Sequence, residues 1–181
     1  METEVLPRVL CVDDEPQILE GLKLVLRKSF EVRTATSGEE ALRQMDDNGP
    51  FTVILSDMRM PGVNGTQFLA EARARDPLAV RILLTGHADI EAAISAINEG
   101  WVFRFLLKPC ERTALRLAFS DALRYHQLVA SEKVLLEQTL RGAVEALMDV
   151  LSISHPLAAA RSQRAAELVA SMAESMDLQD R

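Results

Sequence analysis

The chain has 181 residues, enough for one domain with an appendage but short for two full domains. Its net charge is −7, and no local cluster of Lys and Arg offsets it, which argues against a nucleic-acid surface. The start is acidic and no run approaches the roughly 18 apolar residues of a membrane span, so we expect a cytoplasmic protein without a signal peptide.

Five short apolar runs alternate with helical patterns along the first two thirds of the chain. Strands are predicted at about 8–12, 30–34, 52–56, 80–84 and 102–107. Helices are predicted at about 16–28, 37–48, 65–76 and 88–98, and a further helical pattern begins at Glu111. This alternation predicts an α/β fold in which helices cover both faces of a parallel sheet.

Three local predictions concern the helices. Pro16 is suited to open the first helix, because the first N–H groups of a helix have no partner within it. Ser37 and Glu40 have the spacing of a capping box. In the helix over 88–98, the residues expected to face inward are Ile90, Ala93, Ile94 and Ile97.

Four of the predicted strands are followed by groups that carry charge or donate a hydrogen bond. In chain order these groups are Asp13 and Asp14, Asp57, Thr85, and Lys108. Parallel strands would bring them to one edge of the sheet, where open α/β sheets bind ligands. Three carboxylates at that edge repel one another and require a cation, and an all-oxygen ligand set favours Mg²⁺.

This set of side chains is suited to the transfer of a phosphoryl group to an aspartate. Asp57 would be the nucleophile, and the metal would bridge the reacting groups. Lys108 would pair with Asp57 or bind a phosphoryl oxygen, and Thr85 would donate its hydroxyl to another. The protein would mainly supply positioning and charge neutralisation.

The same residues resemble, in the same order, the receiver domain of two-component response regulators. The resemblance covers about residues 7–125 and rests on five motifs: Val12-Asp13-Asp14-Glu15, Ser56 to Gly62 with Gly65 after it, Thr85-Gly86-His87, Phe105, and Lys108-Pro109. One departure is Gly86, where the family often has Ala. The resemblance implies a flavodoxin-like, five-stranded parallel sheet in the order 2-1-3-4-5.

The resemblance also implies roles for individual residues. A histidine kinase or a phosphotransfer protein would phosphorylate Asp57. Mg²⁺ would be bound by Asp14, Asp57 and the backbone carbonyl of Arg59, with Asp13 acting through water. Thr85, Phe105 and Lys108 would bind the phosphoryl group and switch the conformation of the domain.

The last third of the chain has a different pattern. Apolar residues recur at alternating four- and three-residue steps, interrupted by Lys133, at Val129, Leu136, Leu140, Ala143, Leu147 and Val150. This heptad seam predicts a parallel helical pair, and therefore a homodimer. The alternative is one amphipathic helix that packs on its own domain.

Residues 139–178 also resemble the opening helices of an HD-GYP-type phosphohydrolase domain. The resemblance rests on Thr139 to Leu151, Asp149 to Pro156 and Ser162 to Leu168. Arg161 stands where that family has its first metal-binding histidine, and the later ligands do not follow. We therefore expect no hydrolysis of a cyclic dinucleotide by this chain, which is either a fragment or carries a degenerate binding module.

We predict a receiver over residues 1–125, and a helical stalk with a partial or degenerate output segment over 126–181. The receiver would be a signalling domain that catalyses only its own phosphotransfer and dephosphorylation, without direct contact to nucleic acid. Phosphorylation would switch dimerisation or output through the C-terminal helices. Two alternatives stay open: the regulatory half of an HD-GYP-like phosphodiesterase, and a flavodoxin-like binder that uses the acidic edge for metal alone.

Overall fold

The computed structural model describes residues 6–154, 164–165, 168 and 171–172. In chain order the elements are β1 (Arg8–Val12), α1 (Pro16–Leu26), β2 (Glu31–Ala35), α2 (Gly38–Asn48), β3 (Val53–Asp57), α3 (Gly65–Arg75), β4 (Val80–Thr85), the 3₁₀ turn η1 (His87–Asp89), α4 (Ile90–Asn98), β5 (Arg104–Leu107) and α5 (Arg112–Ser154). No helix in these ranges has both the length and the apolarity needed to span a membrane. The chain divides into two compact units after Ala130.

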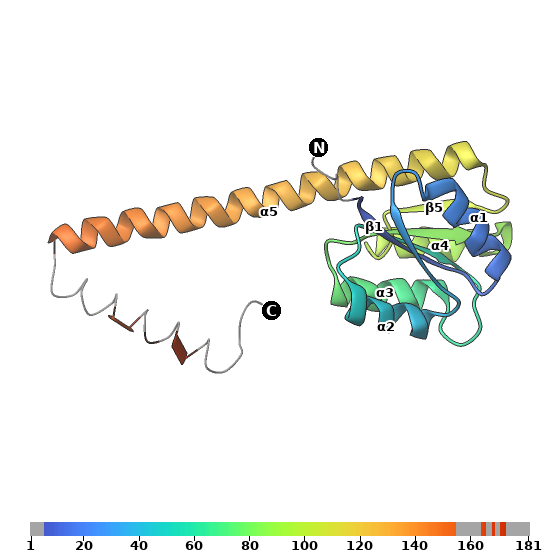
Figure 1. The fold of residues 1–181 in the computed structure, drawn as a ribbon, viewed down its shortest axis with the longest axis horizontal. Helices are drawn as coiled ribbons and strands as arrows, with labels where there is room; N and C mark the ends of the chain where they lie inside the picture. The colour runs from blue at the N-terminus through green and yellow to red at the C-terminus, as the bar shows by residue number, and fades with distance from the viewer. Residues whose placement is uncertain (1–5, 155–163, 166–167, 169–170, 173–181) are drawn as a thin grey trace. The chain divides into compact units, whose positions relative to one another are not determined.

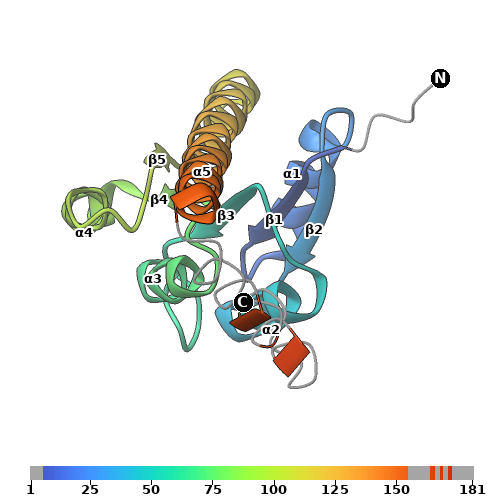
Figure 2. The same cartoon turned by 90° about the vertical axis from the view of Figure 1, so that its left-hand side faces the viewer.

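The receiver part of the fold in Figure 1 is built on five strands, which form one parallel sheet. Their order is β2-β1-β3-β4-β5, as Figure 2 shows, which confirms the predicted topology. Successive side chains of a strand point to opposite faces. In β1, Val9 and Cys11 belong to one hydrophobic cluster, and Leu10 and Val12 belong to the other. The central strands are apolar toward both faces because helices cover both.

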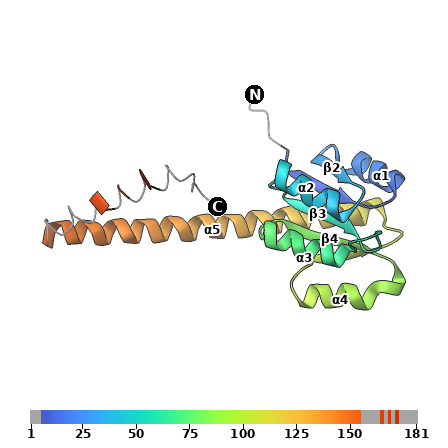
Figure 3. The same cartoon turned by 90° about the horizontal axis from the view of Figure 1, so that it is seen from below.

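Helices α1 and α5 cover one face of the sheet, and α2, α3 and α4 cover the other (Figure 2). On the first face, Phe30 and Phe119 meet edge to face with their ring centroids 5.5 Å apart, which ties α5 to the segment between α1 and β2. On the second face, α2 and α3 lie side by side (Figure 3). The predicted two-sided covering is confirmed.

The start of α3 fixes the end of β3. Asn64 accepts a hydrogen bond from the Gln67 amide at 2.9 Å, and the Gln67 side chain accepts one from the Asn64 amide, so the two form a capping box. The next residue is Gly65, where any Cβ would collide with the carbonyl oxygen of Asp57. The absence of a side chain at Gly65 lets α3 begin directly beside the candidate phosphoacceptor.

Two of the local predictions about helices need correction. Ser37 does accept a hydrogen bond from the Glu40 amide, but the Glu40 carboxylate bonds to the amide and hydroxyl of Thr36 instead of closing the box. These bonds lower the pKa of Glu40. In α4 the buried residues are Ala93 and Ala96, whereas Ile94 is 46% exposed.

Helix α5 is 43 residues long. Its first part packs on the sheet through four buried residues, which are Leu115, Ala118, Phe119 and Ala122. In the second unit, the seam residues Leu136, Leu140 and Leu147 each expose more than half of their surface. The HD-GYP resemblance rests partly on residues 155–163, among them Arg161 and Ser162, which lie outside the described residues.

Candidate functional site

Three carboxylates meet at the carboxyl edge of the sheet. Asp13 and Asp14 follow β1, and Asp57 is the last residue of β3. One oxygen from each carboxylate can be chosen so that all three lie within 4.8 Å of one another. Asp13 and Asp57 are buried, whereas Asp14 faces solvent. The structure thus brings together the three acids that the sequence predicted at this edge.

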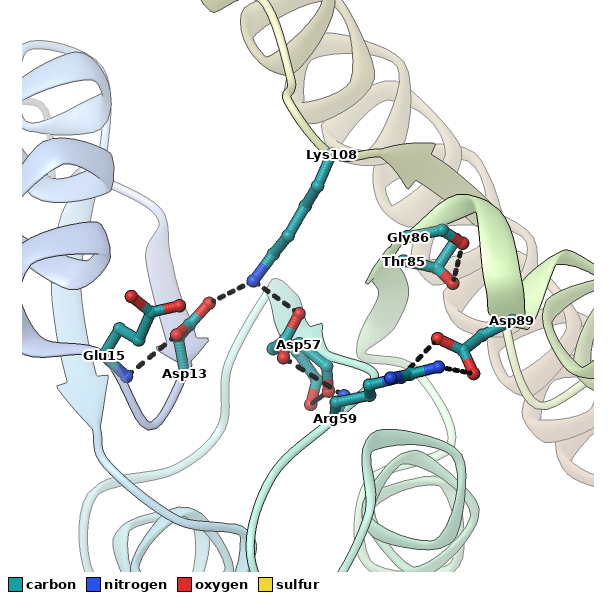
Figure 4. A network of polar contacts seen from close by, with 9 residues as sticks. Asp13, Glu15, Asp57, Arg59, Thr85, Gly86, Asp89 and Lys108 are labelled. Carbon is teal, nitrogen blue, oxygen red and sulfur yellow. Dashed lines mark hydrogen bonds and ion pairs between the residues drawn. The ribbon is translucent and has the colours of Figure 1, made fainter.

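Lys108, which directly follows β5, supplies the positive charge of this cluster. Its Nζ lies 2.6 Å from Asp57 Oδ1 and 3.0 Å from Asp13 Oδ2 (Figure 4). Burial by itself lowers the pKa of the ammonium, but hydrogen bonds to Asp57 and Asp13 outweigh burial, and the pKa of Lys108 lies above its ordinary value. The lysine therefore stays charged and bridges the two buried carboxylates.

Backbone amides orient the same two carboxylates. The Arg59 amide donates to Asp57 Oδ2 at 3.1 Å, and the Glu15 amide donates to Asp13 Oδ1 at 2.9 Å. The chain just after β3 is also fixed, because the Met58 amide donates a hydrogen bond to the Leu84 carbonyl at 2.8 Å. Each oxygen of Asp57 thus has a defined donor, and the carboxylate is held at the mouth of the site.

Thr85 and Phe105 have different positions relative to this cluster. Thr85 ends β4 and is fully buried, and its hydroxyl donates to the Gly86 carbonyl at 3.2 Å and not toward Asp57 (Figure 4). Phe105 lies on β5 opposite Leu83 and packs, half-buried, against the core on the α4 side of the sheet. The two residues thus lie on the strands that precede and follow α4 in the chain.

One further pair of side chains at this edge was not predicted from the sequence. The Arg59 guanidinium donates two hydrogen bonds to the Asp89 carboxylate, at 2.7 Å and 3.1 Å. The Asp89 bonds also raise the pKa of Arg59. The partners are thirty positions apart in the chain and belong to no common motif, so only the fold brings them together.

Comparison with known proteins agrees with this geometry. The family model described as the response regulator receiver domain matches residues 9–120 of this chain. The chain belongs to that family. Residues 9–120 are therefore the receiver domain of a two-component response regulator, with the flavodoxin-like order of strands described above.

Individual relatives resemble the receiver in sequence and in structure. The hydrogenase transcriptional regulatory protein HoxA of Cupriavidus necator is 43% identical over 101 residues, which are 56% of this chain and 21% of HoxA. A solved chain described as an adenylate cyclase from Rhodopirellula baltica is 43% identical with a TM-score of 0.72, over 74% of this chain and 98% of that chain. The receiver of an HD domain-containing protein from Pseudomonas fluorescens Pf-5 is 29% identical with a TM-score of 0.66, over 72% and 96%.

Proposed function

We propose that Asp57 accepts a phosphoryl group from a phosphohistidine of a histidine kinase or phosphotransfer protein. The observation that carries the proposal is the Asp57 carboxylate itself, which ends β3 between the Lys108 ammonium at 2.6 Å and the Arg59 amide at 3.1 Å. A carboxylate oxygen would attack phosphorus and the P–N bond would break. Its electron pair would stay on the imidazole, which then takes a proton from water.

The acidic cluster fits a magnesium ion. Its donors are carboxylate oxygens without His or Cys, and three negative charges share one edge with a single ammonium. We propose that Asp14, Asp57 and the backbone carbonyl of Arg59 bind Mg²⁺ and that Asp13 acts through water. When bound, the ion would offset the carboxylate charge and draw electron density from the phosphoryl oxygens.

Lys108, Thr85 and Phe105 would convert the modification into a change of conformation. Lys108 would move its ammonium from the Asp57 carboxylate to a phosphoryl oxygen. Thr85 would turn its hydroxyl from the Gly86 carbonyl, 3.2 Å away, toward the phosphoryl group. Phe105 would then fill the space that Thr85 leaves, so that the surface around α4, β5 and α5 changes.

We further propose that α5 transmits the change as a helical stalk and that the stalk forms a parallel homodimer. The support is the exposed seam, in which Leu136, Leu140 and Leu147 are 59%, 59% and 69% exposed. Leu140→Glu should abolish dimers in sedimentation analysis. Leu135→Glu, which changes an equally exposed leucine off the seam, should leave them intact. Equal loss in both variants would refute the seam.

The function of the C-terminal output segment remains a prediction. The likeness to the receiver of an HD domain-containing protein supports the alternative in which this chain is the regulatory half of an HD-GYP-like phosphodiesterase. HoxA is named a transcriptional regulator, but the likeness covers only 21% of it and therefore concerns the receiver. We retain the prediction that this chain itself makes no direct contact with nucleic acid.

Intact mass spectrometry tests the proposal directly. After incubation with Mg²⁺ and acetyl phosphate, the wild type should gain one phosphoryl group and Asp57→Asn should gain none. Asp47→Asn, which removes an exposed acid from α2, serves as the matched control and should be modified like the wild type. A domain that uses its acidic edge for metal alone would bind Mg²⁺ and show no adduct in any variant.

A further inference from the structure

A single ion pair joins two of the loops that border the acidic cluster. Arg59 follows β3 and Asp89 ends η1, just before α4. Arg59 Nε lies 2.7 Å from Asp89 Oδ2, and Arg59 Nη2 lies 3.1 Å from Asp89 Oδ1. Two parallel bonds of this kind form the most specific pairing between a guanidinium and a carboxylate. Figure 4 shows Arg59 reaching from beside Asp57 to Asp89.

Asp89 occupies a position with a second possible use. It is the N-cap residue of α4, and its side chain accepts no hydrogen bond from that helix. The first amides of a helix need acceptors, and Asp is among the preferred residues to supply one. The carboxylate of Asp89 is instead bound by Arg59. Pairing with the guanidinium and capping of α4 thus compete for one carboxylate.

Phosphorylation would change the balance of charge within reach of Arg59. The cluster holds three carboxylates and one ammonium, and a divalent cation would bring their sum to zero. A phosphoryl group replaces the single charge of Asp57 with nearly two, so the cluster again becomes negative. The Arg59 amide already contacts Asp57 at 3.1 Å, and the Arg59 side chain is long and 70% exposed. The guanidinium can therefore turn toward Asp57 without crossing a packed core.

We propose that Arg59 exchanges the Asp89 carboxylate for the phosphoryl group on Asp57, and that the released Asp89 then caps α4. A phosphoryl group offers the guanidinium the same two-pronged acceptor as a carboxylate and carries more charge. The exchange rests on the proposed phosphorylation of Asp57. It adds a second cationic side chain, after Lys108, to the phosphoryl site and connects that site to α4 by a route separate from Thr85.

Binding of beryllofluoride, which stands in for the phosphoryl group, tests the exchange by calorimetry in the presence of Mg²⁺. Asp89→Asn removes the competing charge and should bind about threefold more tightly than wild type, the scale of an exposed ion pair. Arg59→Ala should bind more weakly by a similar factor, and adding Asp89→Asn to it should change nothing further. Asp46→Asn is the matched control, because it breaks the Arg75–Asp46 pair at 3.4 Å between α3 and α2, away from the surface around α4, β5 and α5, and should bind like the wild type.

A second measurement follows the cap itself. In α4 the third helical residue is Ala92, whose amide is a usual donor to an N-cap side chain. Its hydrogen exchange should slow when beryllofluoride binds the wild type, and should be slow in Arg59→Ala without beryllofluoride, because both changes release Asp89.

The outcomes separate the two proposals. A wild type that binds no beryllofluoride would overturn the proposed function, and the exchange with it. Binding by the wild type with equal affinity in Asp89→Asn and Arg59→Ala, or with unchanged exchange at Ala92, would overturn the exchange alone.

Discussion

Replacing Lys108 by Met removes the ammonium and keeps most of the length of the side chain. In the structure that ammonium lies 2.6 Å from Asp57 and 3.0 Å from Asp13, and the two acids expose 8% and 0% of their side chains. Loss of one partner from a buried pair costs about 3–5 kcal/mol. The Lys108 side chain is 28% exposed, so water screens part of this interaction and we expect a loss of about 2–3 kcal/mol.

The assay is urea denaturation followed by far-UV circular dichroism in the presence of a chelator. Lys23→Met is the matched control, because Lys23 is an exposed lysine of α1 that belongs neither to the acidic cluster nor to the seam. The control should change the free energy of unfolding by less than about 0.5 kcal/mol. Added Mg²⁺ should stabilise Lys108→Met more than the wild type, since the variant leaves three acids without their ammonium.

A companion variant checks the cause. Asp13→Asn, added to Lys108→Met, removes one of the repelling charges and should restore part of the lost stability. A Lys108→Met variant that loses no more stability than Lys23→Met would refute the stabilising role of the Lys108 ammonium. That role is also refuted if Asp13→Asn destabilises further in the Lys108→Met background, because the acids would then not repel one another.

Further predictions concern Gly65, the two cysteines and the pH dependence of the Lys108 pair. Gly65→Ala should lower the free energy of unfolding by at least about 2 kcal/mol, because the new Cβ would collide with the Asp57 carbonyl oxygen. Gly142→Ala, which has open space around it in α5, should raise the free energy of unfolding by up to about 1 kcal/mol. Urea denaturation measures both changes. Burial raises the pKa of the Cys11 thiol to about 12, so a thiol reagent near neutral pH should modify only Cys110 in the native protein, and rapid modification of a Cys110→Ser variant would contradict this. Pairing with Asp57 and Asp13 raises the pKa of Lys108, so the pair should contribute fully to stability below about pH 10 and lose that contribution as the pH rises through the pKa in the folded state. The difference in urea midpoint between wild type and Lys108→Met should therefore shrink across that pH range. A constant difference would argue against the pairing.

The sequence predicts the sheet well because each strand carries its own signal. Apolar runs such as Val53 to Leu55 are long enough to be recognised as strands, and each is followed by a charged or polar residue. The edge residues Asp13, Asp57 and Lys108 could therefore be placed together from the sheet topology alone. The ends of elements were less accurate. β5 begins at Arg104, two residues after the predicted start, and α1 ends at Leu26, two before the predicted end.

Other features were missed because they depend on three-dimensional neighbours. For α4, the predicted inward residues Ala93 and Ile97 do contact the core, but Ile94 is exposed and Ala96 is buried in its place, because small residues permit close packing of the helix. The Arg59–Asp89 pair joins side chains from two loops and has no periodicity to reveal it. The Asn64–Gln67 capping box was recognisable, since its Asn-x-x-Gln spacing precedes Phe68 and Leu69.

The packing of α4 has a mechanical consequence. The fully buried anchors of this helix are two methyl groups, from Ala93 and Ala96, whereas α3 buries Phe68 and Leu69 in addition to Ala72. One buried methylene or methyl group contributes about 0.8 kcal/mol, so α4 has far less apolar burial to lose than its neighbour when it shifts. Among the helices that cover the sheet, α4 is thus held by the least buried apolar surface. The free energy of a few hydrogen bonds rearranged at its first turn is comparable to that of its buried contacts and is therefore sufficient to shift the helix.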